Sequence, residues 1–551
     1  MHRALSRRFG VVARSTLALA CLLAGGSTAA HAGAVVGTVY VDGTGACAGL
    51  DPCFATIQLG VNNAGPPPAT VFVFPGTYAE SVDLSLMGSA IAGMLGDLTL
   101  RTVNAAGVET DGTARVLPAS GSPFFTSAVL FPGDLTIEGF TVQSPDNDGI
   151  RLNIGPHILA LRNIVSDGNF ARGVIASLTG TAVRITDSSF SNNKNGDGIA
   201  FGIATEVMLS GVTADGNQGG GANFAVSGQV NVINSSLSNN KNGDGLSFGT
   251  ATDVIIDGLT ADANQNDGAS FAVTGQVLVG SSSFSNAKNG DGISFGTATE
   301  VRFERVTANA NQNTGANFAV SGAVYVGSSS FSDAKNGGGI SFGTATEVVF
   351  DDVTADGNQN SGANFGVSGP VQISKSSFSN AKNGDGINFG NATDVNVTGV
   401  VASDNSGRGL LTSLRSALIT ASRFERNATG VHLFVADPLG LVRLRCNDFV
   451  RNGIGLQLGS NVIIDARHNW WGSPSGPTNP ANPGGTGDVI RDGTNGGMGT
   501  VLFIPFLTAP FAESGFCTPG VPAVGSSGML LLALGLLVIP AWRLARRGAG
   551  R

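Results

Sequence analysis

Histidine is the side chain best suited to acid–base or metal chemistry near neutral pH, and this chain has few of them. Past residue 32 there are three: His157, His432 and His468. They are scattered, and no two have the spacing of metal ligands. No Ser-His-Asp or Cys-His grouping can be assembled around them. We therefore expect ordinary surface or cap residues, and we predict no catalytic, cofactor-binding or metal site.

A sequence repeat indicates which structural elements hold these residues. Lys-Asn-Gly runs begin at Lys194, Lys241, Lys288, Lys335 and Lys382, always 47 residues apart. Within each unit, marker glycines alternate spacings of 23 and 24 residues: Gly198, Gly221, Gly245, Gly268, Gly292, Gly315, Gly339, Gly362 and Gly386. So strict a period indicates a stacked repeat architecture in which one unit is two similar turns of chain.

A phenylalanine stands three residues after every marker glycine: Phe201, Phe224, Phe248, Phe271, Phe295, Phe318, Phe342, Phe365 and Phe389. The residue directly after the glycine is apolar and alternates large with small, and the residue between is small. Positions one and three share a face only in a strand. A strand recurring every 23 or 24 residues leaves no room for a crossover helix, so we predict parallel coils with a continuous phenylalanine ladder inside.

Acidic residues repeat with the same period, in two columns. One column follows alternate glycines by eight residues: Glu206, Asp253, Glu300, Glu347 and Asp394; the other precedes them: Asp197, Asp244, Asp291 and Asp385. Neighbours in a column would lie two coils, or about 9.6 Å, apart, which is too far to share one cation. We interpret them as solvated turn acids that the nearby repeat lysines can pair with, and calcium is the one cation left open.

The turns carry a column of Asn and Asp six residues before each marker glycine, including Asp215, Asn239, Asp262 and Asn286. Both residue types tolerate left-handed backbone, which a tight recurring bend requires. These repeats resemble the right-handed parallel β-helix of the pectin-lyase-like superfold, over about residues 34–515. The resemblance implies an all-β, single-stranded solenoid of 23- and 24-residue coils. Catalytic motifs of polygalacturonases and pectate lyases are missing from the sequence.

The ends of the solenoid need caps, because an open end exposes core and unpaired strand edges. Residues 55–64 have a helical face formed by Ile57, Val61 and Ala64, and they resemble the short N-terminal capping helix of bacterial β-helix proteins. Asn469-Trp470-Trp471-Gly472 resembles the terminal segment of such proteins. We interpret the tryptophans as part of a C-terminal cap, with a sugar-stacking platform as the alternative.

Four cysteines lie outside the first 32 residues, an even number that suits an oxidising compartment. Three connectivities are open. We prefer Cys47–Cys53 with Cys446–Cys517, because each bridge would hold one end of the stack.

Both chain ends carry address signals. Four arginines, an apolar run and Ala30-His31-Ala32 form a secretory signal peptide with expected cleavage after Ala32. At the other end, an apolar run and a basic tail follow a short motif, Val521, Pro522, Gly528 and Met529. This order resembles the IPTL- and PEP-type C-terminal sorting signals of Gram-negative bacteria, although Ser527 replaces the usual Trp. It implies a transmembrane helix that anchors the chain transiently and a processing protease at the inner membrane.

These signals divide the chain into successive segments. They are a signal peptide (1–32), an N-terminal cap with irregular first coils (33–148), regular coils (149–460) with strict repeats over about 194–389, a C-terminal cap (461–517), a linker with the sorting motif (518–528), and an apolar segment with a basic tail (529–551). The expected location is the cell surface, the outer membrane or the exterior of a Gram-negative bacterium.

Charge and monotony limit the function. The formal charge is −8, and removal of the eight arginines in the two end segments leaves −16. Such a surface disfavours nucleic acid and acidic glycans unless a divalent cation intervenes. Nearly identical coils cannot build one distinct active site. We therefore favour a non-catalytic, exported structural, adhesive or matrix protein with a polysaccharide or matrix partner. The alternative is a carbohydrate-active lyase or hydrolase whose site lies before Gly198 or after Gly409, where Asp148 and Asp465 stand.

Overall fold

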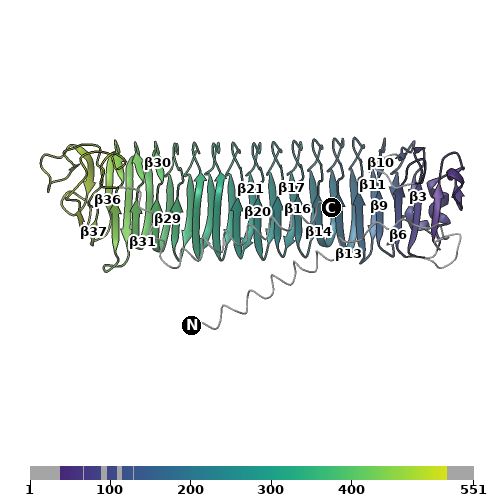
Figure 1. Ribbon diagram of the computed structural model, residues 1–551, viewed down its shortest axis with the longest axis horizontal. Helices are drawn as coiled ribbons and strands as arrows, with labels where there is room; N and C mark the ends of the chain where they lie inside the picture. Colours follow the sequence, from purple (N-terminus) through teal and green to yellow (C-terminus); the bar gives the residue numbers. More distant parts are fainter. Residues whose placement is uncertain (1–36, 66, 88–95, 108–113, 128–129, 518–551) are drawn as a thin grey trace, which may run out of the picture. The chain divides into compact units, whose positions relative to one another are not determined.

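The computed structural model describes residues 37–65, 67–87, 96–107, 114–127 and 130–517. These residues wind into parallel coils whose strands lie side by side along the stack (Figure 1). Each coil contributes to three strand columns, which we call faces A, B and C. Every strand pairing in the columns is parallel, so the fold class predicted from the repeat is confirmed.

Face A holds the strands that follow the marker glycines. In stack order they are β5 (Val82–Asp83), β8 (Phe124–Phe125), β11 (Ile150–Ile154), β13 (Val174–Thr186), β14 (Ile199–Ser210), β15 (Ala222–Val226), β17 (Leu246–Ala251), β19 (Ala269–Val273), β21 (Ile293–Ala298), β23 (Ala316–Val320), β25 (Ile340–Ala345), β27 (Ala363–Val367), β29 (Ile387–Thr398), β31 (Arg408–Thr420), β33 (Thr429–Val435), β36 (Ile454–Leu458) and β39 (Gly487–Arg491). β38 (Pro477–Thr478) pairs with β39.

Face B follows in the same coils, and the long strands β13, β14, β29 and β31 continue into it. Its other strands are β1 (Thr38–Val41), β2 (Cys53–Phe54), β3 (Ala69–Val73), β6 (Leu98–Thr102), β9 (Leu135–Glu138), β12 (Ile158–Arg162), β16 (Val230–Ile233), β18 (Val254–Asp257), β20 (Gln276–Gly280), β22 (Glu300–Glu304), β24 (Ala323–Ser330), β26 (Glu347–Thr354), β28 (Val371–Ser374), β34 (Val442–Arg445), β37 (Ile463–Asp465) and β40 (Thr500–Leu502).

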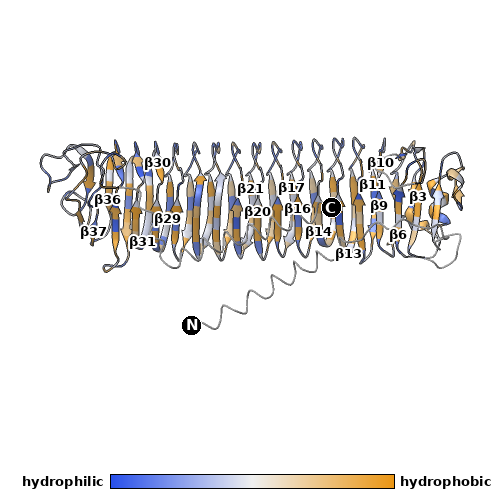
Figure 2. Ribbon diagram, in the orientation of Figure 1, coloured by the Kyte–Doolittle hydropathy of each residue, from blue (hydrophilic) through white to orange (hydrophobic). Residues whose placement is uncertain are grey.

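Face C is the shortest of the three. Its strands are β4 (Gly76–Tyr78), β7 (Ala114–Val116), β10 (Phe140–Val142), β30 (Val401–Ser403), β32 (Arg423–Glu425) and β35 (Asp448–Val450). Across most of the strict repeat it shrinks to single parallel bridges, such as Thr260 to Ser283. Hydrophobic and hydrophilic residues alternate along the strands that face the viewer in Figure 2, because side chains in a strand point alternately in and out.

The predicted phenylalanine ladder fills the interior beside face A. Its members are in register, for example Phe271 with Phe295, and all are buried. From Phe224 to Phe389 successive rings stack with centroids 4.7–5.3 Å apart and planes within 9°. Phe201 begins the ladder less regularly, 6.5 Å from Phe224 at 40°.

A second apolar column that the sequence analysis did not single out packs in the same core. Its fully buried members stand once per 47-residue unit, in the motif Ser-Ser-(Phe/Leu)-Ser: Phe190, Leu237, Phe284, Phe331 and Phe378. A large residue every second coil suits the constant interior volume that close packing demands, as does the alternation of Ile293 with Ala316 on face A.

The marker glycines are explained by close approach between coils. A Cβ placed on Gly245 would lie 2.6 Å from the carbonyl oxygens of Gly268 and Leu237, and one on Gly292 would lie 2.5 Å from that of Gly315. Such contacts would force neighbouring coils apart, so no other residue fits at this column.

The bend before the marker glycines differs from the prediction, which placed left-handed backbone six residues before every one of them. Left-handed backbone falls on the predicted position in alternate coils, as at Asn239 (φ 60°) and Asn286 (φ 62°), but in the coils between it moves one residue on, to Gly216 or Ala263. There the predicted residue has a different role: the Asp262 carboxylate accepts the Ser283 hydroxyl at 2.8 Å. The shift reflects the one-residue difference between 23- and 24-residue coils.

Asparagine side chains also form a buried ladder that the sequence analysis missed. Each amide oxygen accepts the backbone N–H of the equivalent residue one coil before, as from Asn217 to Asn240 and from Asn240 to Asn264, both at 3.0 Å. Alanine takes this position in three later coils: Ala287, Ala334 and Ala381. The ladder satisfies backbone donors that turn away from the regular strand pairing.

The first end of the stack carries the predicted capping helix, and the other end buries an aromatic side chain. Helix α2 (Ile57–Asn62) buries Ile57 and Val61 in the core, and Thr56 caps its first turn. Two 3₁₀ turns, Cys47–Gly49 and Leu84–Leu86, lie in the same region. Trp471 at the other end is completely buried and stacks on Phe449 at 4.6 Å, which favours the cap and excludes the sugar platform for that ring.

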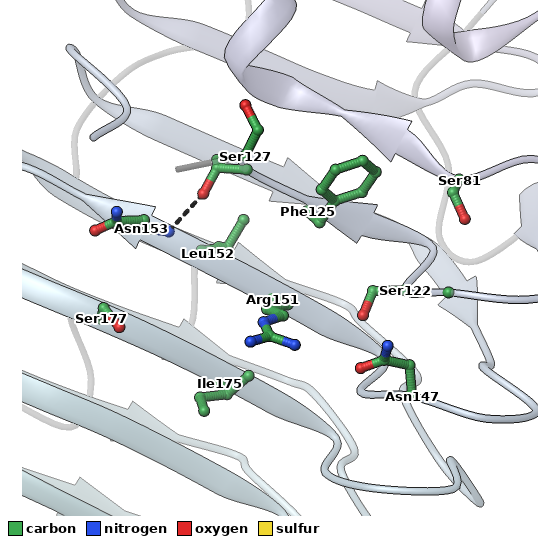
Figure 3. A pocket seen from close by; sticks show the side chains of 12 residues that line it. Ser81, Ser122, Phe125, Ser127, Asn147, Arg151, Leu152, Asn153, Ile175 and Ser177 are labelled. Atoms are coloured by element: carbon green, nitrogen blue, oxygen red, sulfur yellow. Dashed lines mark hydrogen bonds between the residues drawn. The ribbon is translucent and has the colours of Figure 1, made fainter. Parts of the chain in front are cut away.

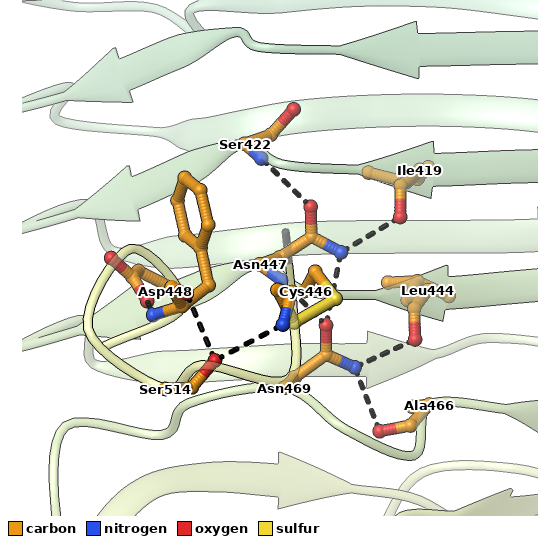
Figure 4. The surroundings of a disulfide bond; sticks show 11 residues. Ile419, Ser422, Leu444, Cys446, Asn447, Asp448, Ala466, Asn469 and Ser514 are labelled. Atoms are coloured by element: carbon orange, nitrogen blue, oxygen red, sulfur yellow. Dashed lines mark hydrogen bonds between the residues drawn. A yellow bond between two sulfur atoms is a disulfide. The ribbon is translucent and has the colours of Figure 1, made fainter. Parts of the chain in front are cut away.

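The disulfides join Cys47 to Cys53 and Cys446 to Cys517, which is the preferred pairing. The second bridge ties a segment near the end of the described chain to β34's following turn, where Asn447 and Asn469 continue a side-chain ladder (Figure 4). A crosslink between residues 71 positions apart restricts the unfolded chain strongly.

Candidate functional site

The outer side of face A is the surface that the repeats multiply. The residues two positions after each marker glycine point outward, are exposed or half-buried, and lie in register from coil to coil. They are Ala200, Asn223, Ser247, Ser270, Ser294, Asn317, Ser341, Asn364 and Asn388. This polar stripe presents hydroxyl and amide groups without a distinct centre. Acid–base chemistry has no group to act through there.

The acids before the marker glycines are more enclosed than the solvated turn residues we expected. Asp267, which the sequence analysis passed over, fills the coil between Asp244 and Asp291. Each carboxylate accepts a backbone N–H from the next coil: Asp267 N to Asp244 Oδ1 at 3.0 Å, and Asp291 N to Asp267 Oδ1 at 2.7 Å. These bonds give the acids a structural role in the turn.

Burial raises the pKa of all three carboxyl groups. For Asp267 the negative charges of Asp244 and Asp291 on either side add to burial and raise its pKa to about 6. Within the described residues no repeat lysine pairs with this column. Asp385 instead lies 3.6 Å from the Arg408 guanidinium.

The second acidic column begins face B, where glutamine occupies some intervening coils, as Gln276 does opposite Glu300. Near its end, Glu347 and Asp394 line a pocket of about 400 Å³ together with Arg443. Tyr325 donates to Glu347 Oε2 at 3.4 Å, and burial together with the nearby glutamates raises the pKa of Tyr325 to about 12.

The two isolated aspartates of the irregular coils have structural partners. Asp148 is buried and accepts the backbone N–H of Arg172 at 3.0 Å, with the guanidinium 3.7 Å away. Asp465 accepts from Arg467 at 2.9 Å and Arg445 at 3.2 Å, and the Arg467 hydrogen bond holds the pKa of Asp465 far below its usual range.

The histidines are as scattered as the sequence indicated. His157 lies 3.8 Å from Asp134, and the His468 ring stacks on Phe516 at 4.3 Å. His432 is not the surface or cap residue that we expected: it lies on β33, is only 7% exposed, and neither ring nitrogen has a hydrogen-bond partner in the described structure. Burial lowers its pKa, so the ring is neutral near pH 7.

A hollow lies in the irregular coils before Gly198. It has a volume of about 590 Å³ and opens on face A at strands β8, β11 and β13 (Figure 3). Its lining residues are Ser81, Gly121, Ser122, Phe125, Thr126, Ser127, Asn147, Arg151, Leu152, Asn153, Ile175 and Ser177. The lining contains an arginine, several hydroxyl and amide groups and an aromatic ring, but no carboxylate and no histidine.

A metal site needs several ligating side chains close together. Over the described ranges, no group of three or more His, Cys, Asp and Glu side chains is placed to hold a metal ion. The Asp244–Asp267–Asp291 column does not form one because each carboxylate is turned to a backbone N–H.

A family model described as a right handed beta helix region matches residues 197–355 and 244–387. The fold is a right-handed parallel β-helix. The matched segments coincide with the strict repeat and together cover less than half of the 551 residues. No curated protein matches the chain.

Several predicted features lie outside the described residues. They are the signal peptide, the sorting motif Val521, Pro522, Gly528 and Met529, and the apolar segment with its basic tail. In the part of the chain that is described, no helix is long and apolar enough to cross a membrane.

Proposed function

We propose that this chain is a non-catalytic β-helix repeat protein that is exported to the cell surface or beyond, where it has a structural, adhesive or matrix role. One observation carries the proposal: face A presents Asn or Ser side chains in every coil from Asn223 to Asn388. A surface of that kind suits many weak equivalent contacts, which add up along a repeat. Catalysis needs one site where groups differ in protonation state, and the stripe has no titratable group.

Export follows from the two end signals in the sequence. In the proposal the mature chain begins at Gly33, and the C-terminal segment holds it in the inner membrane until a protease removes it. Mass spectrometry of the protein released by its native host tests both cuts. A chain that starts at Met1 and keeps Arg551 would overturn this part.

A carbohydrate-active enzyme is the second candidate, and the pocket at Glu347 and Asp394 is the observation that favours it. The two residues stand two coils apart, so their backbones are separated by about 9.6 Å along the stack. The two carboxylates of inverting glycosidases lie about 6.5–9.5 Å apart, so a separation of about 9.6 Å is close to the upper end of that range. Against it, the same pair of positions repeats along the array, as at Glu300 and Asp253, so the pair is not unique to this pocket.

The deciding experiment is a screen of the mature protein against neutral and acidic polysaccharides, with and without calcium. Product formation is followed by new reducing ends and by the ultraviolet absorbance of unsaturated sugars. The scaffold proposal expects no turnover. Reproducible turnover that Glu347→Gln or Asp394→Asn abolishes, and that Glu300→Gln leaves intact, would establish the enzyme instead.

A further inference from the structure

The hollow in the early coils has the features of a specific binding site. At about 590 Å³ it falls in the ~300–1,000 Å³ range typical of small-ligand pockets. It is built on strands β8, β11 and β13, and Ser122 and Asn147 lie together on one side of it (Figure 3). At the outward positions in register with Arg151 and Ile175, the array has small side chains that begin with Ala200.

Arg151 is the one charged side chain in the lining. It is exposed, and it makes no ion pair with any described residue, whereas Arg101 and Arg172 elsewhere in these coils lie beside Glu138 and Asp148. Its guanidinium lies among the side chains of Phe125, Asn147 and Ile175 (Figure 3). A planar guanidinium with free N–H groups fits a carboxylate or a sulfate.

Ser122 provides an independent indication of a ligand. Its side chain is only 6% exposed, yet its hydroxyl has no hydrogen-bond partner in the described structure. Such a buried polar group is destabilising unless something binds to it. Ser122 lines the hollow on the side where Asn147 and Arg151 lie (Figure 3).

The turn that carries Ser122 is held in place by its neighbours. The backbone N–H of Gly121 donates to Asp146 Oδ1 at 2.8 Å, and the Ser144 hydroxyl donates to the Gly121 carbonyl at 2.9 Å. The Pro123 carbonyl accepts the backbone N–H of Val82 at 2.8 Å. The hydroxyl is therefore positioned before any ligand arrives, which lowers the entropic cost of binding.

The remaining lining combines groups that sugars use. Asn147, Asn153 and Ser177 supply amide and hydroxyl groups for ligand hydroxyls, and the half-buried Phe125 ring supplies an apolar surface for the C–H face of a pyranose. We propose that this pocket binds one anionic saccharide unit, with its carboxylate or sulfate on Arg151 and Ser122. The site is separate from the scaffold role of the array, and it gives the acidic protein a local means of holding an acidic glycan.

Isothermal titration of the full mature protein tests the proposal with three probes: a glucuronate-containing tetrasaccharide, a sulfated tetrasaccharide and an uncharged one. We expect the charged probes to bind and the uncharged probe to bind at least tenfold more weakly. Inorganic sulfate should compete with either charged probe. The comparison of carboxylate with sulfate identifies the preferred anion.

Variants locate the site. Arg151→Gln should weaken binding of the charged probes at least tenfold, and Ser122→Ala should weaken it severalfold. Arg302→Gln, an arginine on face B of the array, is the matched control and should leave binding unchanged. Thermal unfolding of each variant establishes that it is folded. Absence of binding by wild-type protein, equal binding of charged and uncharged probes, or binding unaffected by Arg151→Gln would each overturn the proposal, and none would affect the scaffold proposal.

Discussion

The strict array, residues 194–389, and the early coils, residues 114–186, share the same parallel strand columns but differ in what their side chains do. In the array, inward residues form a phenylalanine ladder with rings 4.7–5.3 Å apart, and outward residues repeat. In the early coils, Leu152 and Ala176 occupy the ladder positions, and outward residues include Phe125 and Arg151. The core therefore tolerates either pattern, and the irregular coils bring unlike outward side chains together.

The largest effect should come from breaking the ladder where it is most regular. Phe295 stacks on Phe271 at 5.1 Å and on Phe318 at 4.8 Å, so Phe295→Ala opens a cavity between two rings. We expect a loss of about 3–5 kcal/mol in the free energy of unfolding, measured by denaturant titration. Ser294→Ala, the neighbouring outward residue, is the control and should change stability by about 0.5 kcal/mol or less. Equal losses would mean that inside and outside are reversed.

The asparagine ladder should rank second. Asn264 Oδ1 accepts both the backbone N–H and the side-chain amide of Asn240, each at 3.0 Å. Asn264→Ala leaves these buried donors without an acceptor, at a cost of about 1–3 kcal/mol in the free energy of unfolding. Ala287, which lacks the amide naturally, can be replaced by Gly as a control that removes no acceptor. If the ladder contributed only packing, Asn264→Ala and Ala287→Gly would lower the free energy of unfolding by similar amounts.

The aspartate column should give a smaller effect that depends on pH. The pKa of Asp267 is raised to about 6 in the folded protein, so the folded state binds the proton more tightly than the unfolded state. Its contribution is favourable below about pH 4 and is lost as pH rises through about 6. Asp267→Asn should therefore stabilise the protein by roughly 1–2 kcal/mol at pH 7 and by almost nothing at pH 4.

Unfolding at the two pH values measures this difference, and Asp253→Asn, in the other acidic column, serves as the comparison. If Asp267→Asn leaves the free energy of unfolding unchanged at pH 7, or changes it equally at pH 7 and pH 4, then burial does not raise the pKa of Asp267 as described.

The smallest stability effect is expected in the early coils. Arg151 is exposed and has no ion pair among the described residues, so Arg151→Gln should change the free energy of unfolding by about 0.5 kcal/mol or less. A residue that contributes to binding but not to folding is the opposite of Phe295. Thermal unfolding of the variant checks this, and a large loss would show that Arg151 supports the coil instead of a ligand.

Much of the fold could be predicted because each coil repeats the same physical demand. Gly292 and Phe295 are fixed by close coil approach and by core packing, and these demands leave a periodic trace in the sequence. The disulfide pairing and the burial of Trp471 could be predicted because a stack of coils must be closed at its ends.

The candidate site could not be predicted in the same way. The pocket brings together Ser81, Ser122, Arg151 and Ser177 from successive coils that have no common motif. The exposure of Arg151 and the missing partner of Ser122 depend on side-chain placement, which spacing alone does not give. Asp267 was overlooked because a period of 47 residues draws attention to every second coil, and His432 because nothing around it in the sequence indicates burial.

The central claim is that the array is a stack of equivalent coils that does not build a catalytic centre. Deletion of one unit, Gly245–Asp291, joins Asp244 to Gly292 and restores the local sequence. Small-angle scattering of the deletion variant beside the wild type tests the claim directly. We predict a folded particle shortened by about 9.6 Å, two coils at about 4.8 Å each, that keeps its binding at the Arg151 pocket. An aggregated or unfolded variant, or one whose length is unchanged, would contradict the account.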